Sequence, residues 1–87
     1  MIEIVYSRSF LKDAKHLPAA TQTKLADVIV LLSIHPFDTR LHTKKLSGEL
    51  TGYFSCRITR DWRVIFLFHD KDTIELLAVG HRKDMYR

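Results

Sequence analysis

A nearly continuous apolar segment, Trp62 to Phe68, most strongly limits how this chain can fold. Every residue in it is apolar except Arg63, and such a short run is typical of a central strand that is buried on both faces. An unpaired buried charge is too costly to retain. Arg63 is therefore expected either to pair with a carboxylate or to face an open, hydrated concavity of the sheet.

Two further strands are expected around this one. Tyr53 to Thr59 alternates in the period of a strand, and Thr73 to Val79 is a third strand. The polar residues His69 to Asp72 predict the turn between the second and third strands. Gly80 is expected to end the third strand, and a short polar tail, His81 to Arg87, follows it. Together these segments predict a three-stranded meander.

The loop between the first two of these strands decides where their arginines point. A three-residue loop, Thr59 to Asp61, places Arg57 opposite Arg63 on the same face. A two-residue loop at Arg60-Asp61 places them on opposite faces, because one residue of slip reverses every side chain. Two cations directly opposite each other repel. We favour the three-residue loop, which requires an anion between the two arginines.

The segment before the meander predicts a strand followed by a helical hairpin. Met1 to Tyr6 alternates as a strand does, and Ser7 or Ser9 is suited to cap a first helix. That helix should end before Pro18, which suits the first position of a second helix that stops near His35-Pro36. Apolar residues at helical spacing mark the buried faces: Phe10, Leu11, Ala14 and Leu17 in the first helix, and Leu25, Val28, Ile29 and Leu32 in the second.

These segments predict one small α+β domain over residues 1–87, in the order β-α-α-β-β-β. The N-terminal helical hairpin should cover the antiparallel meander, and a loop from Phe37 to about Leu46 should connect the two. An apolar content of 46% excludes a disordered chain, and a single cysteine, Cys56, excludes an internal disulfide and is expected in the core. The longest apolar run, Val28 to Leu32, is too short to span a membrane. We therefore expect a cytoplasmic protein with no membrane partner.

Basic residues are concentrated in two segments of the chain. Residues 40–63 and 81–87 together hold nine basic and three acidic residues, whereas the remainder has two more acidic than basic residues. Arginine predominates after residue 50, and its fork-shaped head suits phosphate. This distribution indicates a polyanionic partner, most simply a nucleic acid, although a solvated basic surface would have the same composition.

Common catalytic and metal-binding motifs are absent. The chain has no GxxxxGK[ST], GxGxxG or CxxC sequence, and its histidines never fall at HxxxH spacing. A zinc site would have to be assembled from scattered loops. We therefore expect no metal and no cofactor.

Four segments of this chain together resemble the RelE/ParE toxin superfamily. They are Lys45 to Gly48, Gly52 to Thr59, Asp61 to Phe66 and Val79 to Arg87. The resemblance extends over the whole chain, and it is strongest to the RelE, YoeB and YafQ types that cleave mRNA. It implies a RelE-like fold and a toxin of a type II toxin–antitoxin pair, which cuts mRNA in the ribosomal A site and is bound by a cognate antitoxin in a hetero-oligomer.

The resemblance also implies a set of site residues. Metal-free RNA cleavage uses the substrate's own 2′-OH as the nucleophile, so the protein must supply a base, an acid and cations. The expected catalytic residues are Lys44, Arg57, Asp61, Arg63, His81, Arg82 and Tyr86, and the expected RNA contacts are Arg40, Lys45, Arg60, Lys83 and Arg87. Arg63 and Arg57 are assigned to phosphate, Lys44 to a weak base, and His81 with Tyr86 to proton transfer. The alternatives are an exposed loop position for Lys44 and a purely turn-forming role for Asp61.

Two other functions remain open from the sequence. A ParE-like inhibitor of DNA gyrase, or a non-catalytic protein that only binds its antitoxin, would share the fold. A plain RNA-binding protein would share the basic surface. The combination of Tyr86 with His81 in the tail favours cleavage over these alternatives.

Overall fold

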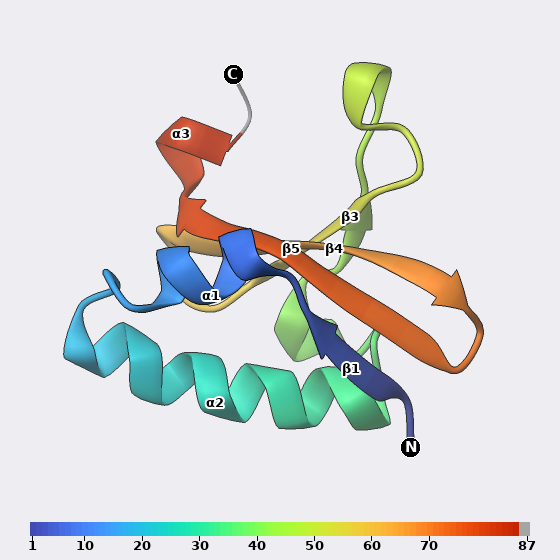
Figure 1. Cartoon of the computed structure of the whole chain (residues 1–87), viewed down its shortest axis with the longest axis horizontal. Coiled ribbons are helices and arrows are strands. Elements are labelled where there is room, and N and C mark those ends of the chain that lie inside the picture. Colours follow the sequence, from blue (N-terminus) through green and yellow to red (C-terminus); the bar gives the residue numbers. More distant parts are fainter. Residues whose placement is uncertain (86–87) are drawn as a thin grey trace.

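The computed structural model describes residues 1–85 of the chain. A strand and two helices lead into a set of short elements, and two long strands and a last short helix follow (Figure 1). In chain order the elements are β1 (Glu3–Tyr6), α1 (Arg8–Ala14), α2 (Ala19–Ile34), the 3-10 turn η1 (Thr39–Leu41), β2 (Lys44–Lys45), the 3-10 turn η2 (Gly48–Leu50), β3 (Phe54–Arg57), β4 (Trp62–Asp70), β5 (Thr73–His81) and α3 (Arg82–Met85).

The strands form one mixed sheet in the order β1-β5-β4-β3-β2. The expected antiparallel meander, β3-β4-β5, lies at its centre, and the α+β class is confirmed. Two edge strands complete the sheet: β1 pairs with β5 in parallel, and β2 pairs with β3 in antiparallel fashion. The prediction of a loop through residue 46 is wrong at Lys44 and Lys45, which form β2.

Both long helical segments cover the same face of the sheet (Figure 1). Ser7, not Ser9, caps α1, because its hydroxyl accepts a hydrogen bond from the Phe10 N–H at 3.0 Å. The sequence had predicted Pro18 as the first residue of the second helix. In the structure it is the residue before α2. The Gln22 side-chain amide donates to three carbonyls at the end of the first helix, those of Ala14, Lys15 and Leu17. These bonds fasten the hairpin.

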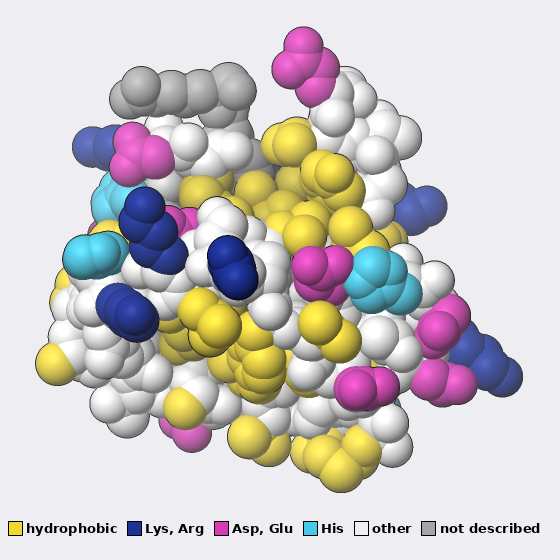
Figure 2. Space-filling view, viewed as in Figure 1, with side chains coloured by type: hydrophobic (Ala, Val, Ile, Leu, Met, Phe, Trp, Pro, Cys, Tyr) yellow, Lys and Arg dark blue, Asp and Glu magenta, His cyan; other side chains and the backbone are white. Residues whose placement is uncertain are grey.

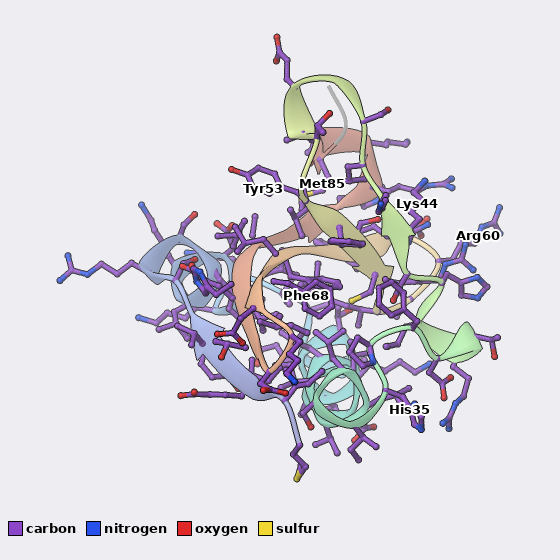
Figure 3. All side chains as sticks on the ribbon, turned by 90° about the vertical axis from the view of Figure 1, so that its right-hand side faces the viewer. His35, Lys44, Tyr53, Arg60, Phe68 and Met85 are labelled. Carbon is purple, nitrogen blue, oxygen red and sulfur yellow. The ribbon has the colours of Figure 1, made fainter. Side chains whose placement is uncertain are left out.

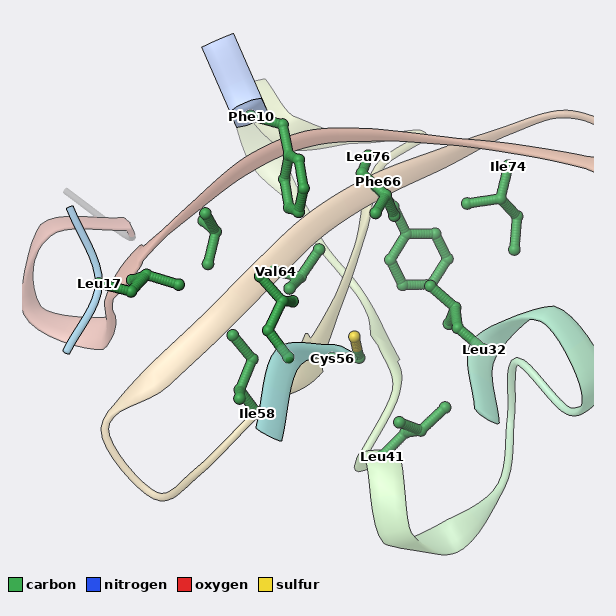
Figure 4. Close-up of a cluster of buried hydrophobic side chains, with 12 residues drawn as sticks. Phe10, Leu17, Leu32, Leu41, Cys56, Ile58, Val64, Phe66, Ile74 and Leu76 are labelled. Carbon is green, nitrogen blue, oxygen red and sulfur yellow. The ribbon is translucent and has the colours of Figure 1, made fainter. Parts of the chain in front are cut away.

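The hydrophobic core fills the space between the helices and the sheet (Figure 4). Leu32 of α2 and Phe66 of β4 are completely buried in it, and Leu41 brings η1 against the same cluster. Cys56 is also fully buried, as expected. Burial raises the pKa of the Cys56 thiol to about 12, so the thiol is protonated and unreactive at neutral pH.

The central strand is buried on both faces, as its composition predicted. Val64, Ile65 and Phe66 are consecutive buried residues of β4. Because side chains alternate along a strand, Val64 and Phe66 face the helices, whereas Ile65 and its partner Ser55 face the other side. We call this second side the open face, because neither α1 nor α2 covers it.

The end of the chain differs from the prediction in two ways. β5 continues through Gly80 to His81, and the polar tail begins with α3. The preceding turn is shorter than expected, because β4 extends to Asp70, whose carboxylate accepts a hydrogen bond from the Asp72 N–H at 2.8 Å.

No helix within residues 1–85 is long and apolar enough to cross a membrane.

Candidate nucleic-acid interface

A groove lies on the open face between the η2 loop and α3. Figure 2 shows hydrophobic side chains gathered in this hollow, between the two projecting segments at the top of the molecule. Its volume is about 510 Å³. Basic, polar and apolar residues line it together: Lys44, Lys45, Leu46, Ser47, Glu49, Leu50 and Met85. Tyr53 and Met85 lie on the side of the sheet away from α2 (Figure 3).

Arg57 and Arg63 are direct cross-strand partners beside this groove. The pairing of β3 with β4 sets Arg57 opposite Arg63, and the Ile58 N–H donates to the Trp62 carbonyl at 2.9 Å. Thr59 to Asp61 therefore form the three-residue loop that the sequence analysis favoured. The two cations share the open face, with Cβ atoms about 4.5–5.5 Å apart for such a pair.

The guanidinium of Arg63 binds the loop that joins its own strand to β3. Its Nη1 donates to the carbonyls of Thr59 at 2.8 Å and Arg60 at 2.7 Å, and to that of Trp62 at 3.3 Å. Backbone carbonyls accept from this nitrogen, a kind of partner that the sequence analysis had not considered. Arg63 therefore has a structural role at the hairpin.

Arg57 differs from Arg63 in its bonding. Its Nε is buried and has no hydrogen-bond partner within residues 1–85. A buried donor without a partner costs about 1–3 kcal/mol, which a bound acceptor would recover. Arg57 lies at the end of β3, beyond the residues that pair with β2, and at this edge of the sheet it also lines a smaller cavity of about 220 Å³ with residues of α2 and η1.

Asp61 connects the β3–β4 loop to the last helix. The Asp61 carbonyl accepts a hydrogen bond from the Arg82 N–H at 2.7 Å, and its Oδ1 lies 3.6 Å from the Arg82 Nε. His81 pairs with Trp62 across the strands, and their rings meet edge to face at 5.4 Å. By that pairing His81 belongs to the helix-covered face, at the end of the sheet where Asp61 and Arg82 lie. The register thus brings Arg57, Asp61, Arg63, His81 and Arg82 to one end of the sheet.

The other expected residues lie in three places. Lys44 and Lys45 form β2 and line the groove, and Lys44 pairs with Ser55 on the open face. Arg60 is exposed in the β3–β4 loop, and Lys83 is exposed in α3. Tyr86 and Arg87 lie outside the described residues.

Arg40 is separated from this group. It lines the smaller cavity, together with residues of α2, and pairs with Asp38 at 3.0 Å. The hydrogen bond from the Arg40 side chain lowers the pKa of the Asp38 carboxyl to about 2, so the pair is ionised at neutral pH. Asp38 binds the Arg40 guanidinium, and the RNA contact expected from Arg40 stays a prediction.

The sequence of this chain matches a known family along nearly its full length. Residues 4–86 match the family model described as the ParE toxin of type II toxin–antitoxin systems. This chain belongs to that family. A comparison with curated protein sequences gives no match.

Solved structures of other toxins share the fold of this toxin. YafQ from E. coli strain BL21(DE3) superposes with a TM-score of 0.82 at 21% identity, over 100% of both chains. The archaeal RelE–RelB complex from Pyrococcus horikoshii gives 0.78 at 24% identity, over 95% of this chain and 97% of that one. The YoeB–YefM complex from Staphylococcus aureus gives 0.76 at 20% identity, over 94% and 98%. The RelE-like fold of this toxin is therefore established.

Two features of the site were missed in the sequence analysis. Gly80 was interpreted as a strand end, yet it lies within β5 opposite Arg63, and Met85 packs over it. The sequence did contain a signal for this contact. Gly80 stands between apolar strand residues and a short polar segment, and a glycine in a strand often marks a place where another part of the chain approaches closely. The carbonyl acceptors of Arg63 had no signal in the sequence, because every residue carries a carbonyl.

Within residues 1–85 no cluster of three or more histidine, cysteine or acidic residues could hold a metal ion. The side chains at this end of the sheet carry guanidinium, carboxylate and imidazole groups, and the ammonium groups of Lys44 and Lys45 lie in the groove. Such groups can bind a phosphate and move protons.

Proposed function

We propose that this toxin is an endoribonuclease that cleaves mRNA in the ribosomal A site without a metal. The observation that supports the proposal best is that Arg57 of β3 and Arg63 of β4 are directly opposite each other in the sheet. Two adjacent guanidinium groups repel each other unless an anion lies between them. A phosphate of the RNA backbone is an anion of the right charge and shape for both.

The proposed reaction needs only groups that this chain contains. The 2′-OH of the substrate attacks the adjacent phosphorus and gives up its proton to a base. The bond from phosphorus to the 5′-oxygen breaks, and an acid protonates that oxygen. The products are a 2′,3′-cyclic phosphate and a 5′-OH end. Arg57 and Arg63 would stabilise the extra negative charge on the phosphate as it forms.

Roles for the remaining residues follow from their chemistry. We assign Lys44, which lines the groove, to the base, and Tyr86 together with His81, which approaches from the end of the sheet, to proton donation. Arg82 would add a third cation at the phosphate, and Asp61 would orient it through their 3.6 Å contact. Lys45, Arg60, Lys83 and Arg87 are proposed to bind the RNA backbone on either side of the cleaved bond.

Arg57→Ala is the sharpest test of this proposal. Because the buried Nε of Arg57 has no hydrogen-bond partner within the described residues, removing this atom leaves no acceptor unsatisfied. Cleavage of a reporter mRNA on translating ribosomes should fall about 10²–10³-fold, the usual effect of losing one preorganised donor. Thermal unfolding should change little.

The matched control is Arg8→Ala, which removes an exposed arginine from α1 on the helix-covered side. It should cleave as the wild type does. Mass spectrometry of the products should find the cyclic phosphate, and EDTA should not stop the reaction if the ribosomes are kept intact. Equal cleavage by Arg57→Ala and Arg8→Ala would refute the role of the arginine pair.

A second candidate function is inhibition of DNA gyrase, which the match to the ParE family model favours. The same purified toxin should be tested for stalling of gyrase on supercoiled DNA. Stalled gyrase together with intact mRNA would replace the first proposal with this one.

We also propose that the partner is a small protein antitoxin with an acidic or amphipathic segment that covers the basic groove. The solved relatives include toxins in complex with RelB, YefM and DinJ. Co-expression of this toxin with the product of its neighbouring gene should restore growth and give a stable complex.

A further inference from the structure

Gly80 leaves a notch in the open face, and Met85 of α3 fills it. A Cβ added at Gly80 would lie 3.0 Å from the Met85 Sδ, which is closer than ordinary van der Waals contact. The notch is a matter of space rather than backbone strain, because Gly80 lies within an extended strand. Gly80 is also the cross-strand partner of Arg63.

This contact is one of a few that hold α3 in place. The helix is four residues long, and a single turn is not stable by itself because helix nucleation is unfavourable. Its first residue is fixed by the hydrogen bond from the Arg82 N–H to the Asp61 carbonyl. The Lys83 N–H donates to the His81 Nδ1 at 3.2 Å. At the other end of the helix, the Met85 side chain packs against β5 at Gly80.

The position of Met85 matters for the groove. Met85 lines the groove opposite Leu46 and Leu50 of the η2 side, so the width of the groove depends on where α3 sits. A shift of Met85 therefore changes the wall of the groove.

We propose that Gly80 and Met85 are positioning residues. The Met85 side chain fills the notch at Gly80, and this contact holds α3 in place at the proposed active site. This inference rests on the proposed ribonuclease activity. Neither side chain supplies a proton or a charge. Their contribution is geometric, and a displacement of 1 Å at a reacting group costs about 10²-fold in rate.

A double-mutant cycle tests the contact between Gly80 and Met85. Gly80→Ala should push Met85 out by a few tenths of an ångström and lower mRNA cleavage about 3- to 10-fold. In a Met85→Ala background the notch is empty, so Gly80→Ala should change the rate by less than about twofold. Equal effects of Gly80→Ala in both backgrounds would overturn the proposal, because the glycine would then act on the strand and not through Met85.

Limited trypsin digestion measures how firmly the same contact holds α3, without any need for RNA cleavage. Arg82 and Lys83 are exposed in α3, and a trypsin cut after either requires the short helix to open. Gly80→Ala should speed release of the C-terminal peptide about threefold or more, and should not do so in the Met85→Ala background. The fluorescence of Trp62, the single tryptophan, and the thermal midpoint should confirm that all variants are folded.

The two measurements separate the possible failures. A wild type that cleaves no RNA disproves the proposed function and the positioning role with it, whereas the trypsin result still decides whether Met85 occupies the notch. If the wild type is active, and the Gly80 and Met85 substitutions are coupled in trypsin digestion but not in cleavage, the contact holds α3 without positioning the reaction. That result would overturn the proposal.

Discussion

Replacing Arg63 by alanine should destabilise the toxin, apart from any effect on RNA. The Arg63 Nη1 is within 2.7–3.3 Å of three carbonyls, those of Thr59, Arg60 and Trp62. A hydrogen bond from a charged donor contributes about 1.5–3 kcal/mol when it is well shielded. These acceptors share one nitrogen, and Arg60 is exposed, so the free energy of unfolding should fall by about 1–2 kcal/mol in total.

Thermal unfolding followed by circular dichroism measures this change. In a domain of this size each kcal/mol lowers the midpoint by about 4–8 °C, so Arg63→Ala should melt about 4–16 °C below the wild type. Urea titration should give a lower midpoint with an unchanged slope, because the surface exposed on unfolding is nearly the same.

Arg60→Ala is the matched control, because it removes an exposed guanidinium from the same loop. Its free energy of unfolding should stay within about 0.5 kcal/mol of the wild type. If Arg63→Ala is as stable as Arg60→Ala, the bonds from Arg63 to the loop carbonyls contribute nothing to stability. If it is destabilised as expected, loss of activity in Arg63→Ala must be compared with Arg57→Ala before it is assigned to catalysis.

Two further predictions concern stability and the buried thiol. Ser7→Ala should lower the free energy of unfolding by about 1–2 kcal/mol, because the hydroxyl caps α1 and donates to the Leu77 carbonyl at 3.1 Å; Ser9→Ala, measured by the same urea titration, should change it far less. The Cys56 thiol should resist a thiol reagent at pH 8 until the protein is unfolded, because burial raises its pKa to about 12. Its contribution to stability should be present below pH 9 and lost as the pH rises from about 9 towards 12, since the unfolded state loses the proton first; rapid labelling of the folded protein at pH 8 would contradict the burial.

The sequence predicted the parts of the fold that depend on periodicity. Apolar residues at helical and strand spacing were sufficient for the two helices and the meander, and the apolar run around Ile65 correctly indicated burial on both faces. The length of the loop between Arg57 and Arg63 left two registers open from the sequence, and the structure has the favoured one, which sets the two arginines opposite each other.

The parts that were missed depend on contacts between distant segments. Lys44 and Lys45 have no strand-like pattern, and they become a strand only because β3 offers its edge. The short helix α3 is defined by its contacts with Asp61 and Gly80, which lie in other elements. In the candidate site, residue types pointed to a basic cluster, but only coordinates reveal that backbone carbonyls bind Arg63 and that Asp38 binds Arg40.

The parallel pairing of β1 with β5 has a consequence for the order in which this toxin is made and folds. Ser7 donates to the carbonyl of Leu77, a residue 70 positions later in the chain. The first strand and the cap of the first helix must therefore wait for nearly the last strand to leave the ribosome. Closing so long a loop makes folding slow, and the end of the sheet that carries Arg63 and Gly80 is assembled at the same late stage. The parallel edge of the sheet therefore cannot form until synthesis of the chain has passed β5.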